Sequence, residues 1–342
     1  MDNASYIEIG TNGQEQESWE NLTGRGTGMA KGMEILRIFP DYMRDKWREA
    51  AEEADGLWEI RLRVHREIIL IIRGREYFLG KNGRIVSDMK NADVMTQQDM
   101  EAVLDHICNY SIYAFSDEIR QGFLTIPGGH RVGMAGQAIL EENGTLRNIK
   151  NIRFMNIRIS HEIKGAADTV MPYLYENGRL QDTLLISPPG CGKTTVLRDM
   201  VRQISDGNRY GKGMNVAVVD ERSEIAGCYM GCPQNDIGRR TDVLDGCPKA
   251  LGMMMLIRSM SPQVLAVDEL GSDEDMRAVR RALQCGSRML ATVHGDSLED
   301  VMGKELFMVF KEKKIFSRYI VLERRGEKHG IKAIYDGDFR VC

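Results

Sequence analysis

The segment from Ser187 to Thr194 constrains the fold of this chain more than any other, because it places glycines in a loop that ends in Lys-Thr. A short apolar run, 183–186, precedes the loop, and a helical pattern, 194–204, follows it. Glycines let successive backbone N–H groups of such a loop point at one anion, at the amino end of the helix. The pattern therefore predicts a strand, a phosphate-binding loop and a helix within an α/β domain.

The residue types in this loop suit a nucleoside triphosphate bound with Mg²⁺. We expect Lys193 to reach the β- and γ-phosphates and the Thr194 hydroxyl to join the ligands of the magnesium ion. The usual pattern opens with glycine where this chain has Ser187, and the two prolines that follow stiffen the turn instead. The alternative is a chance Gly-Lys-Thr at a helix start, which the flanking strand and helix disfavour. The expected nucleotide-binding residues are Ser187, Pro188, Pro189, Gly190, Cys191, Gly192, Lys193, Thr194 and Thr195.

The third apolar strand along the chain, 264–267, ends on the carboxylates of Asp268 and Glu269. We expect Asp268 to hold the magnesium ion with its bound water, and Glu269 to be the general base that orients the attacking water. The alternative is an acidic pair that caps the helix expected from Asp273. The place of this strand downstream of a phosphate-binding loop favours the catalytic interpretation.

Further acidic residues follow the apolar strand 216–219. Glu221 and Glu224 are candidate catalytic residues, because an additional carboxylate here could assist the attacking water or the magnesium ion. The alternative is a surface ion-pair cluster around Arg222.

A histidine, His294, ends the fourth apolar strand, 289–293. Its imidazole and the Thr292 hydroxyl can both donate to a γ-phosphate, so this strand end is a candidate sensor, although a lone histidine is more often a core or surface residue. Four apolar strands separated by helical stretches predict a parallel sheet with crossover helices, whose carboxyl ends face the ligand.

The first half of the chain has a different pattern. Apolar and charged residues alternate over 58–64, and two further strand-sized runs follow between turn signals, which predicts a small antiparallel sheet. Thr96 is the expected cap of a helix. We therefore expect a flexible tail over 1–28, an α+β domain over 29–160, and the nucleotide-binding α/β domain over 161–342.

Composition limits the classes of partner and compartment. The net charge of −4 gives no whole-protein attraction to nucleic acid, so we expect no nucleic-acid partner. No apolar stretch approaches the ~20 residues of a membrane-spanning helix, and seven cysteines without paired spacing suit a reducing cytosol. We expect a cytoplasmic protein. A nucleic-acid-stimulated motor and a nucleotide-dependent scaffold with little turnover stay open as alternatives.

The order of these motifs resembles that of the secretion-type ATPases of type II and type IV systems, where a P-loop is followed by an acidic box, an acidic Walker B strand and a histidine box. Longer segments resemble the stage III sporulation protein AA family, and this resemblance spans residue 33 to the C-terminus. The segments that carry it are 59–63, 128–133, 156–159, 219–227, 233–236, 240–248 and 253–260.

The resemblance implies a RecA-like secretion-type ATPase domain that hydrolyses ATP with Mg²⁺. It implies that hydrolysis powers assembly of, or transport through, the channel between mother cell and forespore in endospore formation. The expected location is the cytoplasmic, mother-cell side of that channel, peripheral to the membrane. The expected partners are the membrane channel proteins of the stage III sporulation operon and other copies of the chain, in a hexameric ring.

Such a ring would need a cation supplied to the γ-phosphate from outside the P-loop, the role of an arginine finger. Arg153 and Arg158 are the candidates for this catalytic role, with Arg239 and Arg240 as alternates. Each of the four could instead be an ordinary surface arginine.

Overall fold

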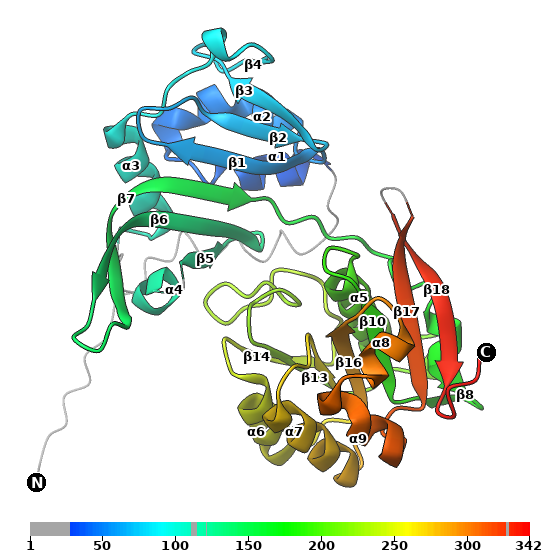
Figure 1. Cartoon of the computed structure of the whole chain (residues 1–342). Helices are drawn as coiled ribbons and strands as arrows, with labels where there is room; N and C mark the ends of the chain where they lie inside the picture. The colour runs from blue at the N-terminus through cyan, green and yellow to red at the C-terminus, as the bar shows by residue number, and fades with distance from the viewer. Residues whose placement is uncertain (1–27, 111–114, 121, 326–327) are drawn as a thin grey trace, which may run out of the picture. The chain divides into compact units, whose positions relative to one another are not determined.

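The computed structural model describes residues 28–110, 115–120, 122–325 and 328–342 (Figure 1). The tail expected over 1–28 lies outside these residues except for its last position. The chain forms two compact units. The first comprises Met1–Ser116, Ala135–Gln137 and Lys150–Met155, and the second comprises Asp117–Met134, Ala138–Ile149 and Asn156–Cys342. The domain boundary expected at residue 160 stays a prediction.

A seven-stranded sheet forms the centre of the second unit, in the spatial order β14-β13-β15-β16-β10-β17-β18. Every neighbouring pair is parallel except β17 with β18. The strands are β10 (Thr183–Ser187), β13 (Val216–Asp220), β14 (Thr241–Asp245), β15 (Val264–Val267), β16 (Arg288–His294), β17 (Arg318–Arg325) and β18 (Lys328–Asp336). The expected parallel α/β sheet is confirmed, and its four expected strands are β10, β13, β15 and β16.

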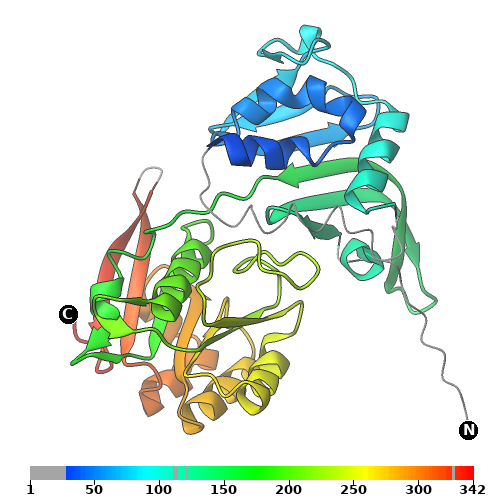
Figure 2. The same ribbon diagram turned by 180° about the vertical axis from the view of Figure 1, so that it is seen from behind.

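Helices cover both faces of this sheet, because successive strand residues point to opposite sides. Val216 and Val218 of β13 pack in one apolar core with Leu197 of α5, whereas Ala217 and Val219 pack in the other core with residues of α6 and α7. Figure 2 shows α5 in front of the sheet, from the side opposite to Figure 1. The helices are α5 (Lys193–Asp206), α6 (Lys249–Ser259), α7 (Asp273–Gln284), α8 (Leu298–Met302) and α9 (Glu305–Lys313).

The strand order brings the expected motifs to one edge. β16 lies between β15 and β10, and its register places His294 directly opposite Ser187. Because all these strands run in the same direction, the P-loop after β10, the acidic pair after β15 and the acidic segment after β13 share the carboxyl edge of the sheet.

A second sheet has the order β4-β3-β2-β1-β7-β6-β5, and its strands β6 and β7 contribute residues to both units. The alternation expected in β1 holds for Ile60 and Leu62, which are buried. It fails at Trp58, which is exposed, because the strand register shifts between Leu57 and Glu59. The Thr96 hydroxyl caps α3 and accepts from the Asp99 N–H at 3.0 Å. The strands are β1 (Leu57–Arg63), β2 (Ile69–Ile72), β3 (Arg75–Leu79), β4 (Ile85–Val86), β5 (Phe123–Ile126), β6 (His130–Leu140) and β7 (Leu146–Arg158).

The remaining elements are short. The helices are α1 (Gly28–Leu36), η2 (Asp41–Trp47), α2 (Arg48–Glu52), η3 (Met89–Asn91), α3 (Gln97–Ile107), α4 (Ser116–Arg120) and η5 (Met171–Leu174). The two-residue strands are β8 (Tyr175–Glu176), β9 (Arg179–Leu180), β11 (Gly207–Asn208) and β12 (Gly211–Lys212). Over the part of the chain that the structure describes, no helix has the length and apolar character needed to cross a membrane.

Candidate nucleotide-binding site

The loop between β10 and α5 has the backbone shape of a phosphate cradle. Gly190 and Gly192 have φ values of 73° and 79°, in the left-handed region that residues with a Cβ atom rarely adopt. Gly192 occupies the N-cap position of α5 and has no side chain to cap the first turn. The free N–H groups and the positive end of the 14-residue helix α5 therefore point at the loop, as an anion site requires.

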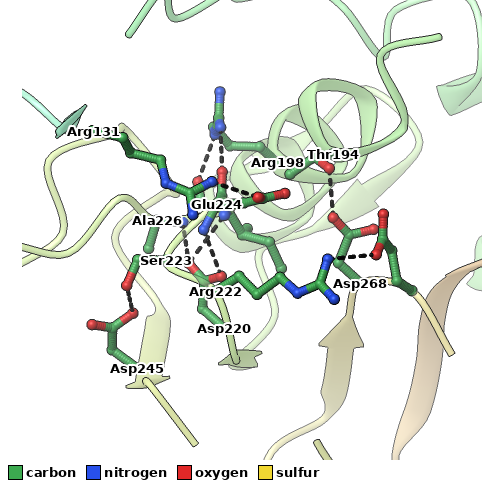
Figure 3. A network of polar contacts seen from close by, with 12 residues as sticks. Arg131, Thr194, Arg198, Asp220, Arg222, Ser223, Glu224, Ala226, Asp245 and Asp268 are labelled. Atoms are coloured by element: carbon green, nitrogen blue, oxygen red, sulfur yellow. Dashed lines mark hydrogen bonds and ion pairs between the residues drawn. The ribbon is translucent and has the colours of Figure 1, made fainter. Parts of the chain in front are cut away.

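The Asp268 carboxylate is held by two threonine hydroxyls. Thr194 Oγ1, at the start of α5, donates to Asp268 Oδ2 at 2.5 Å, and Thr292 Oγ1, from the middle of β16, donates to Asp268 Oδ1 (Figure 3 shows the first contact). The structure thus brings together the two expected magnesium ligands, Thr194 and Asp268. Hydroxyl and carboxylate oxygens are ligands that Mg²⁺ prefers.

Thr292 also positions Glu269, the residue that follows Asp268. The Glu269 N–H donates to Thr292 Oγ1 at 2.9 Å, and Glu269 has a left-handed φ of 54°, a conformation that costs free energy in a residue other than glycine. One hydroxyl therefore fixes both the Asp268 carboxylate and the Glu269 backbone. The sequence suggested Thr292 as a phosphate sensor, whereas in the structure its fully buried hydroxyl is occupied by these two neighbours.

His294 connects the P-loop lysine to the candidate general base. Lys193 Nζ lies 2.9 Å from His294 Nδ1, and His294 Nε2 lies 2.7 Å from Glu269 Oε1. An ammonium group can only donate, so Nδ1 accepts and Nε2–H donates to the carboxylate. The other oxygen of Glu269 lies 3.2 Å from the exposed Arg222 guanidinium. The predicted phosphate-binding lysine, sensor and general base, Lys193, His294 and Glu269, thus lie in one line of contacts.

Burial shapes the charge of Lys193. The side chain is buried at the start of α5, and this burial lowers the pKa of Lys193 from its usual value, although Asp268 and Glu269 oppose the effect. A buried cation with nearby carboxylates is poised to exchange its neutral histidine contact for a charged acceptor.

The acidic segment after β13 is organised by Asp220, which is buried. Its two carboxylate oxygens accept from the backbone N–H groups of Glu224, Ile225 and Ala226 at 2.8–3.0 Å (Figure 3). Burial raises the pKa of Asp220, and these three hydrogen bonds act in the opposite direction. Asp220 thus shapes the loop that presents the two candidate glutamates.

These two glutamates, Glu221 and Glu224, both have cationic partners. Glu221 pairs with Lys249 at the start of α6, and Glu224 Oε1 accepts from Arg131 of β6 at 2.5 Å. A small cavity of about 20 Å³, roughly the room of one water molecule, lies beside them. Its lining is Val219, Asp220, Glu221, Arg222, Glu224, Lys249, Asp268 and Glu269.

Two arginines at this edge have structural contacts that the sequence analysis missed. Arg198 of α5 donates to the Glu224 and Ile225 carbonyl oxygens, each at 2.5 Å, and thereby ties the acidic loop to the P-loop helix (Figure 3). Arg131 lies with its guanidinium 4.3 Å from the centre of the Phe123 ring and pairs with Glu224. Its sequence neighbours Gly128 to Gly133 were recognised as a motif, but no local pattern indicates which side chain it meets.

The four arginines proposed for the finger role occupy different places. Arg158, at the end of β7, is exposed, as is Arg153 of the same strand. Arg239 and Arg240 lie at the carboxyl end of α5, where the Arg240 guanidinium donates to the Ser205 carbonyl at 2.9 Å. Because α5 is about 20 Å long, these two lie far from the P-loop of their own chain.

The remaining P-loop residues follow the turn as expected. Ser187 is fully buried at the end of β10, and its hydroxyl donates to the Pro188 carbonyl at 3.0 Å. Cys191 is buried, and Thr195 is partly buried in the first turn of α5. Among the described residues, no group of three or more His, Cys, Asp or Glu side chains could hold a metal ion. A Mg²⁺ ion that shares phosphate oxygens and water needs only one or two protein ligands.

Two solved structures have a similar fold. The ATPase DotB of Legionella pneumophila aligns with a TM-score of 0.57 at 14% identity, over 88% of this chain and 82% of that chain. The pilus retraction motor PilT with bound ADP aligns with a TM-score of 0.54 at 16% identity, over 82% of this chain and 78% of that chain. These likenesses show the fold, and the expected RecA-like P-loop architecture is confirmed.

Sequence relationships are closer. Stage III sporulation protein AA of Bacillus subtilis (strain 168) is 40% identical over 312 residues, which cover 90% of this chain and 96% of the relative. The family model described as "Sporulation stage III, protein AA" matches residues 29–341. The chain therefore belongs to the stage III sporulation protein AA family.

Proposed function

We propose that this chain binds ATP with Mg²⁺ at the carboxyl edge of its parallel sheet and hydrolyses it. The observation that carries the proposal is the line of contacts from Lys193 through His294 to Glu269, beside the contact of Thr194 with Asp268. This arrangement supplies a phosphate-binding cation, a pair of magnesium ligands and a general base within one site. DotB, which has the same fold, is an ATPase, and PilT was solved with bound ADP.

Binding of the triphosphate would use the loop and its lysine. The N–H groups of the loop at Gly190 and Gly192 would surround the β-phosphate, and Lys193 would exchange His294 Nδ1 for phosphate oxygens. The exchange is favourable because the phosphate oxygens carry negative charge and attract the ammonium group more strongly than the neutral imidazole does. Thr194 and Asp268 would hold the magnesium ion, which supplies positive charge to the phosphate oxygens when bound.

Hydrolysis would use Glu269 as the base. Release of Lys193 from His294 leaves the imidazole free to orient Glu269 or to donate toward the γ-phosphate. The small cavity beside Glu269 and Asp268 has room for the attacking water. Glu221 and Glu224 border this cavity and would orient the water or adjust the local charge.

A cation from outside the P-loop would complete the site. Arg131 joins Arg158 as a candidate, because it lies at this edge, where Glu224 holds its guanidinium. Arg153, Arg239 and Arg240 remain proposals for a finger contributed by a neighbouring subunit of a ring.

The biological role follows from the family. We infer that hydrolysis powers assembly of, or transport through, the channel between mother cell and forespore. The chain would act in the mother-cell cytoplasm as a hexameric ring, held at the membrane by the channel proteins of the stage III sporulation operon. No nucleic-acid partner is proposed.

Phosphate release from ATP and Mg²⁺ tests the proposal, with and without single-stranded DNA. Turnover by the wild type should be lost in Lys193→Ala and Glu269→Gln. It should persist in Glu274→Gln, which makes the same chemical change at an exposed position of α7. Strong stimulation by DNA would instead indicate a nucleic-acid motor, and binding without turnover would indicate a scaffold. Either result would contradict the proposal.

A further inference from the structure

A cavity of about 540 Å³ lies at the amino edge of the parallel sheet, opposite to the nucleotide site. Asp182 directly precedes β10, and Arg288 begins β16, so the length of β10, about 16 Å, separates this cavity from the P-loop. The helices α7 and α9 end beside it. The lining, which we name the basic cleft, is Asp182, Arg280, Leu283, Gln284, Gly286, Ser287, Arg288, Lys313, Lys314 and Ile315.

The charges of the basic cleft are unbalanced. Arg288 pairs with Asp182 at 2.9 Å, and Lys314 pairs with Asp338. The side chains of Arg280 and Lys313 form no ion pair or hydrogen bond with any residue that the structure describes. In a chain of net charge −4, two unpaired cations beside two paired ones make a local positive surface.

Two apolar side chains, Leu283 and Ile315, line the basic cleft together with these cations. Leu283 is partly buried on the last turn of α7, and Ile315 is buried after the end of α9. The volume lies in the range of about 300–1,000 Å³ that is typical of ligand-binding sites. The cations come from three separate elements, α7, β16 and α9, with apolar side chains among them. Cations that are distributed over three elements fit the several carboxylates of an extended peptide segment better than one small anion.

We propose that the basic cleft docks an acidic segment of a partner protein. Carboxylates of the segment pair with Arg280 and Lys313, and its apolar side chains contact Leu283 and Ile315. Asp182 holds Arg288 in place, so the rim keeps its shape without the partner. Electrostatic attraction of this kind favours acidic partners and weakens with salt. The cleft is separate from the nucleotide site, so docking does not depend on ATP hydrolysis.

Fluorescence anisotropy with the full-length chain tests the proposal. The probe is a labelled peptide of alternating glutamate and leucine. It is compared with a lysine–leucine peptide, single-stranded DNA and vesicles of phosphatidylglycerol. The glutamate–leucine peptide should bind, and binding should weaken about tenfold in Arg280→Glu with Lys313→Glu, because two attractive contacts become repulsive.

Two controls separate the cleft from general charge and from the ATPase. Arg277→Glu reverses one charge on an exposed part of α7 outside the cleft, as Arg280→Glu alone does inside it. Arg277→Glu should leave binding unchanged. Lys193→Ala should also bind the peptide normally, whatever its hydrolysis rate.

Several results would overturn the docking proposal. One is an equal loss of peptide binding in Arg277→Glu and in Arg280→Glu alone. Another is preferential binding of DNA or vesicles that the double variant, Arg280→Glu with Lys313→Glu, abolishes. The third is no binding of the glutamate–leucine peptide to the wild type. A change in oligomeric state of the double variant without peptide binding would instead assign the cleft to contacts between copies of this chain.

Discussion

Replacement of Thr292 by valine removes one hydroxyl from the centre of the site and keeps its shape. The Thr292 side chain is fully buried, donates to the Asp268 carboxylate and accepts from the Glu269 N–H. Valine leaves a carboxylate oxygen and an N–H group without this partner. A hydrogen bond to a charged group contributes about 1.5–3 kcal/mol and a neutral one about 1 kcal/mol, so the folded site should lose about 3 kcal/mol.

Much of this loss should appear in catalysis. Glu269 has a left-handed backbone conformation, and its N–H bond to Thr292 helps to hold it there. We expect Thr292→Val to lower kcat about 30-fold, which corresponds to about 2 kcal/mol. Affinity for ATP should change little, because the Thr292 hydroxyl contacts Asp268 and Glu269 rather than Lys193 or the glycines of the P-loop. Steady-state phosphate release and titration with a fluorescent ATP analogue measure these two quantities.

Thr292→Ser is the matched control, because serine keeps the hydroxyl and removes only a methyl group. It should retain most of the turnover. A Thr292→Val enzyme within about twofold of the wild type, or equal losses in the serine and valine variants, would refute the positioning role of the hydroxyl.

Three further changes probe the site and its surroundings. Gly192→Ala forces a Cβ atom into a left-handed conformation, so it should lower stability by about 1 kcal/mol and weaken ATP binding. Gly271→Ala should do neither, because Gly271 does not have a left-handed φ. Thermal unfolding and ATP titration measure the two effects. Burial raises the pKa of Cys228 to about 12, so at pH 8 its neutral thiol should resist iodoacetamide while the exposed Cys232 reacts, as peptide mass mapping would show. The pKa of Lys193 is lowered in the folded state. Between that lowered pKa and the ordinary value of 10.5, the unfolded state therefore binds more protons than the folded state. In this pH window the unfolding free energy of the wild type, relative to that of Lys193→Met, should rise with pH. Rapid alkylation of Cys228 would contradict its burial. A difference in unfolding free energy between the wild type and Lys193→Met that does not change with pH would contradict the lowered pKa of Lys193.

The sequence predicted the parts of the site whose signals are local. A strand, a glycine loop and Lys193-Thr194 lie within a dozen residues, and the apolar strand before Asp268 is equally compact. Their parallel sheet and RecA-like fold are confirmed. The catalytic and binding roles of these residues stay predictions, although the structure places them at one edge.

Contacts that depend on strand order were beyond the sequence. Thr292 meets Asp268 only because β16 lies next to β15, and Arg131 meets Glu224 across 93 positions of the chain. Local pattern carries no information on such pairs. The sequence analysis also gave no role to Asp220, whose carboxylate accepts from three backbone N–H groups and shapes the loop that carries Glu221 and Glu224.

The methionine-rich helix α6 shows another limit. Met253 of this helix is fully buried. Met255 and the cap residue Met260 are 48% and 46% exposed. Residue type gave the apolar character of α6, but the face it buries depends on its packing against β13 and α7.

Single-turnover hydrolysis by Glu269→Gln tests the central claim most directly. The amide keeps the size of the side chain and removes its capacity to accept a proton. With radiolabelled ATP and Mg²⁺, the variant should bind ATP as tightly as the wild type and release phosphate at least about a hundredfold more slowly. Phosphate release at the wild-type rate, with ATP bound equally well, would show that Glu269 is not the base and would contradict the account.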